Sequence, residues 1–339
     1  MDDRRPTIHD VAALAATSKS TVARALSDKG AIAAGVRDRV LAAARQLGYE
    51  PNQMAGSMRS GRSRLIGLVI PDIANPFWAE VARGAQERAV EAGLSLLFFS
   101  SDWRSDQEAH HMRALVRARV DGAIINTVVD RAEALHAFGL PLVLIGSSAE
   151  EFKSLPAVGS DIPQTVRLGL DYLAGRGHGA PTLILGPPQR IAGRLFASSV
   201  RDHLAARGLS RDVVTETADY TVEGGHAAML RILDARPGPC HITVFAANDL
   251  MALGAMMALR DCGLECPRDV SILGCDGIVA GTFSSPGLTT VAKPARALGT
   301  RAVAMLAEAI EGHPALTRVH LPSRLIERGS VADLRLGPR

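Results

Sequence analysis

The stretch "TIHDVAALAATSKSTVARAL", residues 7–26, holds two helix starts in quick succession. Thr7 can cap a helix with its hydroxyl, and Asp10 follows at the spacing of a capping box, so a first helix begins here. Ser18 repeats the signal and predicts a second helix from about Lys19 to Leu26. Two short, separately capped helices joined by a tight turn indicate a helix-turn-helix of the kind that binds DNA.

A third helix is predicted from about Val36 to Leu47, with Gly48 as its C-terminal stop. Residues 1–64 hold 11 Lys and Arg against 6 Asp and Glu, although the net charge of the whole chain is only +3. A basic head on a near-neutral body suits binding to phosphates. Residues 52–64, which contain two glycines, are predicted to form a linker.

From residue 65 onward, apolar runs of strand length alternate with helical stretches, which predicts parallel sheets covered on both faces. Strands are expected at 65–70, 94–99, 122–126, 140–146, 180–186, 241–246 and 270–276. Helices are expected at 77–92, 107–118, 163–176, 194–207, 222–235 and 249–262. The series restarts after residue 160, so we expect two doubly wound units. Two such units that face each other form a cleft at the carboxyl ends of their strands.

The bulk composition excludes several classes of protein. With 339 residues, 47% of them apolar and 22% charged, the chain is long enough for two or three globular units. No apolar run approaches the ~20 residues that span a bilayer, and no secretion signal precedes the first helix, so we expect a cytoplasmic protein without a membrane partner. The four cysteines form no CxxC pair and are expected to be reduced.

Nothing in the sequence indicates an enzyme, a metal site or a cofactor. The motifs GxSxG, HExxH and GxxxxGK[ST] do not occur. The glycine-rich string "GRGHG", residues 175–179, precedes a predicted strand instead of following one, so it is predicted to be a turn. His110 and His111 are adjacent and cannot face one metal from a regular helix. We therefore expect a binding protein without catalytic activity.

Motifs along the whole chain resemble the LacI/GalR family of bacterial transcription regulators. They include "TIHDVAALAATSKSTVARALS" (7–27), "IGLVIPDIANPFWAEVARGAQERAVEAG" (66–93), "AANDLMALGAM" (246–256), "PGLTTVAKP" (286–294) and "LPSRLIERGS" (321–330). The resemblance implies an α/β protein with an N-terminal all-α helix-turn-helix head and a periplasmic-binding-protein-like body of two doubly wound parallel-sheet subdomains.

The same resemblance divides the chain into expected parts. They are a DNA-binding domain at 1–50, a hinge helix or linker at 51–62, an N-terminal effector-binding subdomain at 63–162 and 292–320, and a C-terminal one at 163–291 and 321–335.

In the head, the second helix matches the family's recognition helix, which enters the major groove and contacts base edges. The expected DNA-binding residues are Thr7, Ser18, Lys19, Ser20, Thr21, Arg24, Asn52 and Met58. Of these, Thr7 and Ser18 either hold phosphates or only cap their helices, and both roles can coexist. Met58 occupies the position of a leucine that wedges into the minor groove, unless the segment is a plain linker and Met58 packs on the body. Ala16 departs from the family, in which glycine is frequent in this turn.

In the body, the resemblance assigns an effector-binding cleft. The expected residues are Phe77, Trp78, Asp102, Arg194, Tyr220, Asn248 and Asp276. Aromatic faces stack on sugar rings, and a guanidinium clamps hydroxyls or a carboxylate, so Arg194 and Asp276 are the main expected pair. One of the two adjacent aromatics is instead expected to pack in the core. Asp102 fits a surface loop equally well.

Together these features predict a sequence-specific regulator, most simply a repressor. It would bind a pseudo-palindromic operator in double-stranded DNA as a homodimer, and a small molecule such as a sugar or sugar acid would control its affinity. Two alternatives stay open. One is a corepressed regulator of the same family that responds to a purine or another metabolite. The other is a small-molecule binding protein without a DNA function.

Overall fold

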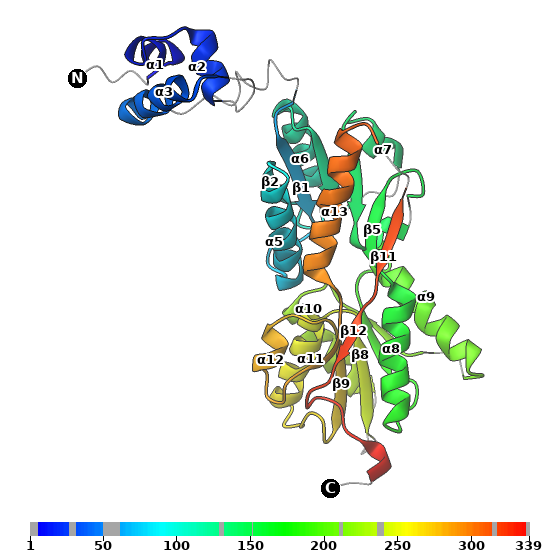
Figure 1. The fold of residues 1–339 in the computed structure, drawn as a ribbon. Coiled ribbons are helices and arrows are strands. Elements are labelled where there is room, and N and C mark those ends of the chain that lie inside the picture. Colours follow the sequence, from blue (N-terminus) through cyan, green and yellow to red (C-terminus); the bar gives the residue numbers. More distant parts are fainter. Residues whose placement is uncertain are drawn as a thin grey trace. The chain divides into compact units, whose positions relative to one another are not determined.

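A computed structural model describes residues 6–26, 32–49, 62–128, 132–150, 152–209, 213–235, 241–313 and 317–336. The chain forms two compact units, Met1–Ser63 and Arg64–Arg339. Figure 1 shows both units, and each is described by itself below. The predicted hinge segment at 51–62, with Asn52 and Met58, lies outside the described residues except for its last position.

The first unit is a bundle of three short helices. They are α1 (Ile8–Leu14), α2 (Lys19–Leu26) and α3 (Ala34–Leu47). Its core consists of small apolar side chains contributed by all three helices: Val11, Ala12, Ala15, Val22, Ala25, Val40, Ala43 and Ala44. The helical N-terminal region predicted from sequence is confirmed, with α3 beginning two residues earlier than expected.

The ends of these helices follow the capping signals in the sequence. The main-chain N–H of Thr7 donates to the Asp10 carboxylate at 2.7 Å, which completes the capping box of α1. The hydroxyl of Ser18 accepts from the main-chain N–H of Thr21 at 3.2 Å and caps α2. Gly48 ends α3 in the left-handed region, with φ of 62°.

The second unit contains two six-stranded sheets (Figure 1). The first sheet has the order β11-β5-β4-β3-β1-β2, and all its strands are parallel. Its strands are β1 (Leu65–Ile70), β2 (Ser95–Ser100), β3 (Gly122–Ile125), β4 (Leu142–Ile145), β5 (Ala157–Ser160) and β11 (Arg318–Leu321). We call this sheet with its helices the first subdomain.

Helices cover both faces of the first sheet. They are α5 (Pro76–Glu91), α6 (Ser105–Arg117), α7 (Ala132–His136), α13 (Ala295–Ile310) and the short 3-10 helix η1 (Gly146–Glu150). Side chains alternate along β1: Ile66 and Leu68 pack with α5 and α13, whereas Val69 packs with α6 and α7 on the other face. Helices α5 and α13 touch closely, because a Cβ on Gly84 would lie 2.0 Å from the Arg296 carbonyl.

The second sheet has the order β12-β10-β9-β8-β6-β7, and only β12 runs antiparallel to its neighbour. Its strands are β6 (Thr182–Leu185), β7 (Thr215–Thr217), β8 (Ile242–Ala246), β9 (Val270–Asp276), β10 (Thr289–Ala292) and β12 (Arg324–Ile326). The helices that go with it are α8 (Ile162–Gly175), α9 (Ile191–Ala206), α10 (Val222–Ala235), α11 (Asp249–Asp261), α12 (Ala280–Phe283) and η2 (Leu334–Leu336). We call this group the second subdomain.

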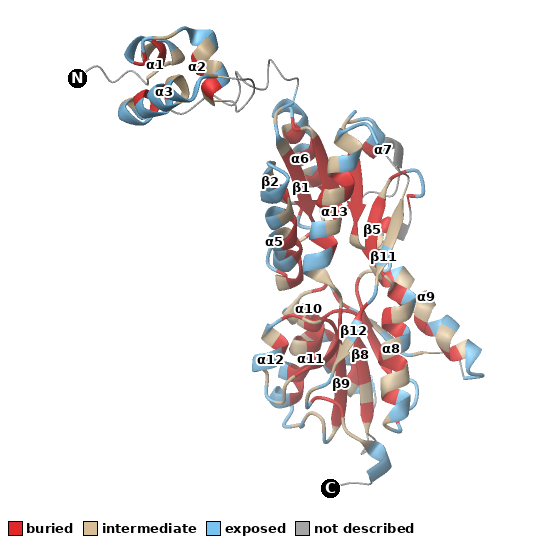
Figure 2. Ribbon diagram, viewed as in Figure 1, coloured by how far each residue is buried: buried red, intermediate tan, exposed pale blue. Residues whose placement is uncertain are grey.

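The chain passes between the two sheets after β5, after β10 and after β11. The central strands of both sheets are buried, whereas the strands β2, β7, β11 and β12 at the sheet edges are only partly covered (Figure 2). The α/β class with two doubly wound parallel sheets is therefore confirmed. In the described part of the chain, no helix is both long and apolar enough to span a bilayer.

Candidate functional site

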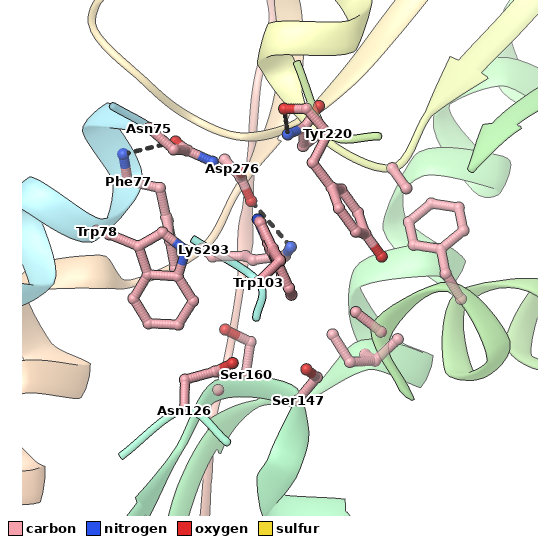
Figure 3. A pocket seen from close by; sticks show the side chains of 16 residues that line it. Asn75, Phe77, Trp78, Trp103, Asn126, Ser147, Ser160, Tyr220, Asp276 and Lys293 are labelled. Carbon is pink, nitrogen blue, oxygen red and sulfur yellow. Dashed lines mark hydrogen bonds and ion pairs between the residues drawn. The ribbon is translucent and has the colours of Figure 1, made fainter. Parts of the chain in front are cut away.

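One cavity of the second unit lies where the carboxyl ends of the strands of both sheets meet (Figure 3). The first subdomain lines it with Asn75, Phe77, Trp78, Trp103, Asn126, Gly146, Ser147 and Ser160. The second subdomain lines it with Ile162, Ala192, Phe196, Tyr220, Ala247, Asn248, Asp276 and Lys293. This is the location at which open α/β sheets bind ligands, because the loops that follow the strands converge there.

The N-terminus of α5 positions one aromatic wall. Asn75 caps the helix, and its side-chain oxygen accepts from the main-chain N–H of Phe77 at 3.0 Å. Pro76 follows at the first helical position, where its fixed φ suits the helix. The rings of Phe77 and Trp78 are then held edge to face, with their centroids 5.1 Å apart. Both side chains are buried and line the cavity.

A second aromatic group bridges the two subdomains. The ring of Trp103, from the loop after β2, stacks on the ring of Tyr220 with centroids 5.0 Å apart and 17° between the planes. The guanidinium of Arg190 lies over Trp103, 5.4 Å from the ring centroid, and also donates to its main-chain carbonyl. Gly186 leaves room for Tyr220, since a Cβ there would lie 1.9 Å from its ring. Burial raises the pKa of Tyr220 to about 12, so the phenol stays neutral.

An ion pair lies in the same cavity. The Lys293 ammonium is 2.9 Å from the Asp276 carboxylate. Burial lowers the pKa of Lys293, but the neighbouring Asp276 and Cys275 together raise it above its ordinary value, so the lysine stays charged. Burial raises the pKa of Asp276, whereas Lys293 and a side-chain hydrogen bond from Asn75 act in the opposite direction. Asn75 belongs to the first subdomain, so this bond also crosses the cleft.

The remaining polar lining consists of amides and hydroxyls. Asn248 caps α11 through its side-chain oxygen, which accepts from the Met251 N–H at 2.8 Å, and its amide nitrogen donates to the Tyr220 carbonyl at 3.0 Å. Asn126 donates to the Ile145 carbonyl at 2.7 Å. The hydroxyls of Ser147 and Ser160 join Asn126 on the side of the cavity formed by the first subdomain, as Figure 3 shows.

A second buried carboxylate supports the loop after Asp276. Asp249 accepts from the main-chain N–H groups of Gly277 and Ile278 at 2.7 and 2.8 Å, and from the Thr290 hydroxyl at 2.6 Å. Burial, followed by the nearby charge of Asp276, raises the pKa of Asp249 to about 7. Asp249 therefore ties the ends of β9 and β10 together directly behind the ion pair.

Five of the seven residues predicted for the cleft line one cavity. They are Phe77, Trp78, Tyr220, Asn248 and Asp276. The other two lie elsewhere. Asp102 is exposed, and its carboxylate accepts from the Ser100 hydroxyl at 2.7 Å. The next residue, Trp103, reaches the cavity instead, after both residues have taken positive φ values of 49° and 59°.

Arg194, the other member of the main expected pair, does not line this cavity. Ala192 and Phe196 of α9 face the cavity, and each lies two residues from Arg194. Two residues correspond to about 200° of rotation around a helix, so Arg194 points the other way. Its guanidinium is exposed and donates to the Gln189 carbonyl at 2.8 Å. Helix α9 therefore contributes Ala192 and the larger Phe196 to the site.

Sequence reasoning also missed Asn75, Asn126 and Lys293. Each had a local signal: Asn75 begins "NPFW", Asn126 ends "GAIIN" and Lys293 lies in "TTVAKP" directly after a strand. Within the described residues, no cluster of His, Cys, Asp and Glu is placed to hold a metal ion. Cys262, Cys266 and Cys275 are free thiols.

In the first unit, α2 presents a polar face. Lys19, Ser20 and Arg24 are exposed, whereas Val22 and Ala25 are buried against the other helices. The Lys19 ammonium lies 3.3 Å from a ring nitrogen of His9 on α1. Thr7 and Ser18 both make capping hydrogen bonds, as described above. The side chains predicted to contact bases are thus on the solvent side of the helix that follows the turn.

Comparison with protein-family models matches two regions. Residues 7–52 match the bacterial regulatory proteins of the lacI family, and residues 170–331 match the periplasmic binding protein-like domain. The first match covers the three-helix unit. The second covers most of the second subdomain together with α13 and β11.

Two relatives match nearly the whole chain. The ribose operon repressor of Halalkalibacterium halodurans is 31% identical over 95% of this chain and 96% of its own length. The transcriptional regulator MalR of Streptomyces coelicolor is 34% identical over 96% of both chains.

Among solved structures, the Lac repressor dimer bound to operator and the anti-inducer ONPF superposes with a TM-score of 0.86 at 26% identity. The match covers 97% of this chain and 100% of that one. A complex of the transcriptional regulator CelR with cellobiose gives a TM-score of 0.70 at 28% identity, over 96% of this chain and 100% of that one.

Proposed function

The chain belongs to the LacI family of bacterial regulatory proteins, and from that premise we propose that it is a repressor whose operator affinity depends on a small molecule in the cleft between its two subdomains. The family makes it a DNA-binding transcription regulator with an effector-binding domain. One observation supports the control of this DNA binding by a small molecule. The same chain combines a helix with an exposed Lys–Ser–Arg face and a polar, aromatic-walled cavity between two parallel sheets.

In the head, α2 would enter the major groove. Lys19 and Arg24 can donate to guanine O6 and N7, and Ser20 and Thr21 can contact either base type. Thr7 and Ser18 would hold phosphates near the helix N-termini and fix the register. Asn52 and Met58 stay predictions for the hinge, where Met58 would enter the minor groove.

In the body, the cleft would hold a sugar or sugar acid. The rings of Phe77, Trp78 and Tyr220 offer flat surfaces for the CH face of a sugar, and Asp276, Lys293 and the serine hydroxyls offer hydrogen bonds to its hydroxyls. Two relatives fit this class, since one is a ribose operon repressor and another has been solved in complex with cellobiose.

A flat nitrogenous base is the second candidate. Trp103, Phe196 and Tyr220 add aromatic surface beyond the α5 pair, and a purine-responsive, corepressed regulator would use such walls for stacking. We do not favour this candidate, because the hydroxyls and the ion pair are better matched to a ring with several hydroxyl groups.

A homodimer would place two α2 helices on the two halves of a pseudo-palindromic site. Exposed apolar side chains on the second subdomain support association of two copies: Phe283 is 80% exposed, Val279 is 64% exposed and Met257 is 41% exposed. The outer face of α5 is the second predicted contact. Such a dimer would let closure of the cleft reposition the two heads, which couples effector binding to operator binding.

The experiment first selects, from a random library, the DNA duplexes that the full-length protein retains. The affinity for the selected duplex is then measured with and without candidate effectors. We expect one sequence with two half-sites to be enriched, and a sugar or sugar acid to change its affinity. Retention of all duplexes with equal affinity would refute sequence-specific binding. Purines that change the affinity while sugars do not would favour the second candidate.

A further inference from the structure

The charges that line the cleft balance each other. All of its lining residues lie in the described part of the chain, and the only Asp, Glu, Lys or Arg among them are Asp276 and Lys293. Their charged groups are 2.9 Å apart, and the two side chains are only 5% and 16% exposed. The cavity therefore holds one buried positive and one buried negative charge in direct contact.

Two further guanidinium groups lie near the cleft but are not part of its lining. The exposed guanidinium of Arg194 donates to the Gln189 carbonyl. The guanidinium of Arg190 lies over the Trp103 ring, on the second aromatic group. The rest of the polar lining consists of neutral amides and hydroxyls. No second charged group is thus available in the lining to compensate a charged ligand.

Lys293 also connects the two subdomains. It comes directly after β10 of the second sheet, where the chain passes to α13 of the first subdomain. Its ammonium contacts Asp276 at the end of β9 and lies 5.7 Å from the ring centroid of Phe77 at the start of α5. A cation near an aromatic face is attracted to it. One lysine therefore contacts both the cleft carboxylate and the aromatic wall, at a point where the chain passes between the subdomains.

We propose that the Asp276–Lys293 pair selects an uncharged, hydroxylated ring as the effector, and that Lys293 is the residue that sets this preference. This inference rests on the function proposed above and narrows its ligand class to neutral sugars. A hydroxyl can accept a hydrogen bond from Lys293 and donate one to Asp276, so the pair holds it without loss of charge balance. A carboxylate close to Lys293 would also face the buried Asp276, and an ammonium close to Asp276 would face the buried Lys293.

Removal of one member of the pair leaves the charge of the other uncompensated. The two single substitutions should therefore shift the preferred ligand charge in opposite directions. The Asp276→Asn substitution leaves the ammonium of Lys293, so the preference should move toward an anionic sugar. The Lys293→Met substitution leaves the carboxylate of Asp276, so the preference should move toward a cationic sugar. A purely structural role of the pair would lower the affinity for all three ligand charges equally.

The experiment measures binding of three charge forms of one ring to the full-length protein by calorimetry at pH 7. The probes are glucose, glucuronate and glucosamine, and the corresponding forms of galactose and mannose. Wild type should bind a neutral member at least about tenfold more tightly than either charged form. In Asp276→Asn the ratio of uronate to neutral affinity should rise at least about tenfold, and in Lys293→Met the ratio of amino sugar to neutral affinity should do the same.

Matched controls remove the same charges from exposed positions of the same unit. Lys153→Met and Asp202→Asn should keep the wild-type order of the three forms, since both side chains are exposed. If a single substitution at the pair prevents folding, the double variant Asp276→Asn/Lys293→Met removes both buried charges. It should discriminate less against both charged forms than wild type does.

Two results would count against the proposal in different ways. If a uronate binds wild type as tightly as its neutral sugar, charge selection by the pair is wrong, although a sugar-responsive regulator still stands. If no sugar binds wild type or any variant in any charge form, the sugar class proposed for the effector is wrong, and this inference fails with it.

Discussion

The turn between α1 and α2 contains a residue in an unfavourable conformation. Ala16 has φ of 49°, in the left-handed region, and its side chain is exposed. For an L-residue other than glycine, this conformation costs about 1–2 kcal/mol of conformational free energy, whereas glycine adopts it without that cost. Glycine loses about 0.5–1 kcal/mol more chain entropy on folding. Because the exposed methyl group contributes no core packing, Ala16→Gly should stabilise the three-helix unit by roughly 0.5–1 kcal/mol.

Hydrogen exchange of the full-length protein measures this change in the unit itself. Amides of the buried Val11, Val22 and Val40 should exchange roughly two- to fivefold more slowly in Ala16→Gly than in wild type. The matched control is Ala13→Gly, the same chemical change at an exposed position inside α1. It should accelerate exchange, because glycine in a helix interior costs about 1 kcal/mol. Equal acceleration by both substitutions would refute the strain assigned to Ala16.

Four further substitutions test the remaining assignments. Lys19→Ala should cost about 1–3 kcal/mol of operator affinity and relax the preference at one base pair, and an equal loss on random DNA would show a phosphate contact instead. Phe196→Ala removes a buried ring from the cavity and should weaken effector binding and cost about 3–5 kcal/mol of stability, whereas Arg194→Ala should leave effector binding unchanged in calorimetry. The opposite pattern would return Arg194 to the site. Burial lowers the pKa of His178 below its ordinary value of 6.5, so the unfolded chain takes up the proton first. Stability against urea should therefore fall as the pH drops below about 6.5, and a His178→Gln variant with the same pH profile would contradict this.

Sequence periodicity predicted the long, buried elements well. Strands β1 and β9 are largely apolar runs between turn signals, and their predicted bounds coincide with the observed ones. The short strands β7 and β12 carry no such pattern, because each has three residues and lies at the edge of its sheet. Their pairing depends on neighbouring strands that are distant in the sequence, so a local sequence pattern does not predict it.

In the site, too, a local sequence pattern does not fully predict which side chains face the cavity. Asp276 and Asn248 follow directly from the rule that ligands bind at the carboxyl ends of strands. The structure places Trp103 and Phe196 in the cavity lining, one and two residues along the chain from the predicted Asp102 and Arg194. At Asp102 the positive φ values turn the loop, and at Arg194 the helix rotates by about 100° per residue. A local pattern assigns the loop or helix, but the packed structure decides which of its side chains faces the cavity.

Effector binding in the cleft is proposed to change the affinity of the three-helix unit for operator DNA. The most direct measurement is the affinity of the full-length protein for its selected operator, followed by fluorescence anisotropy, without effector and with effector at saturation. The account predicts a change of at least about fivefold, within the usual range of allosteric coupling. An unchanged operator affinity, while calorimetry shows the effector bound in the cleft, would contradict it.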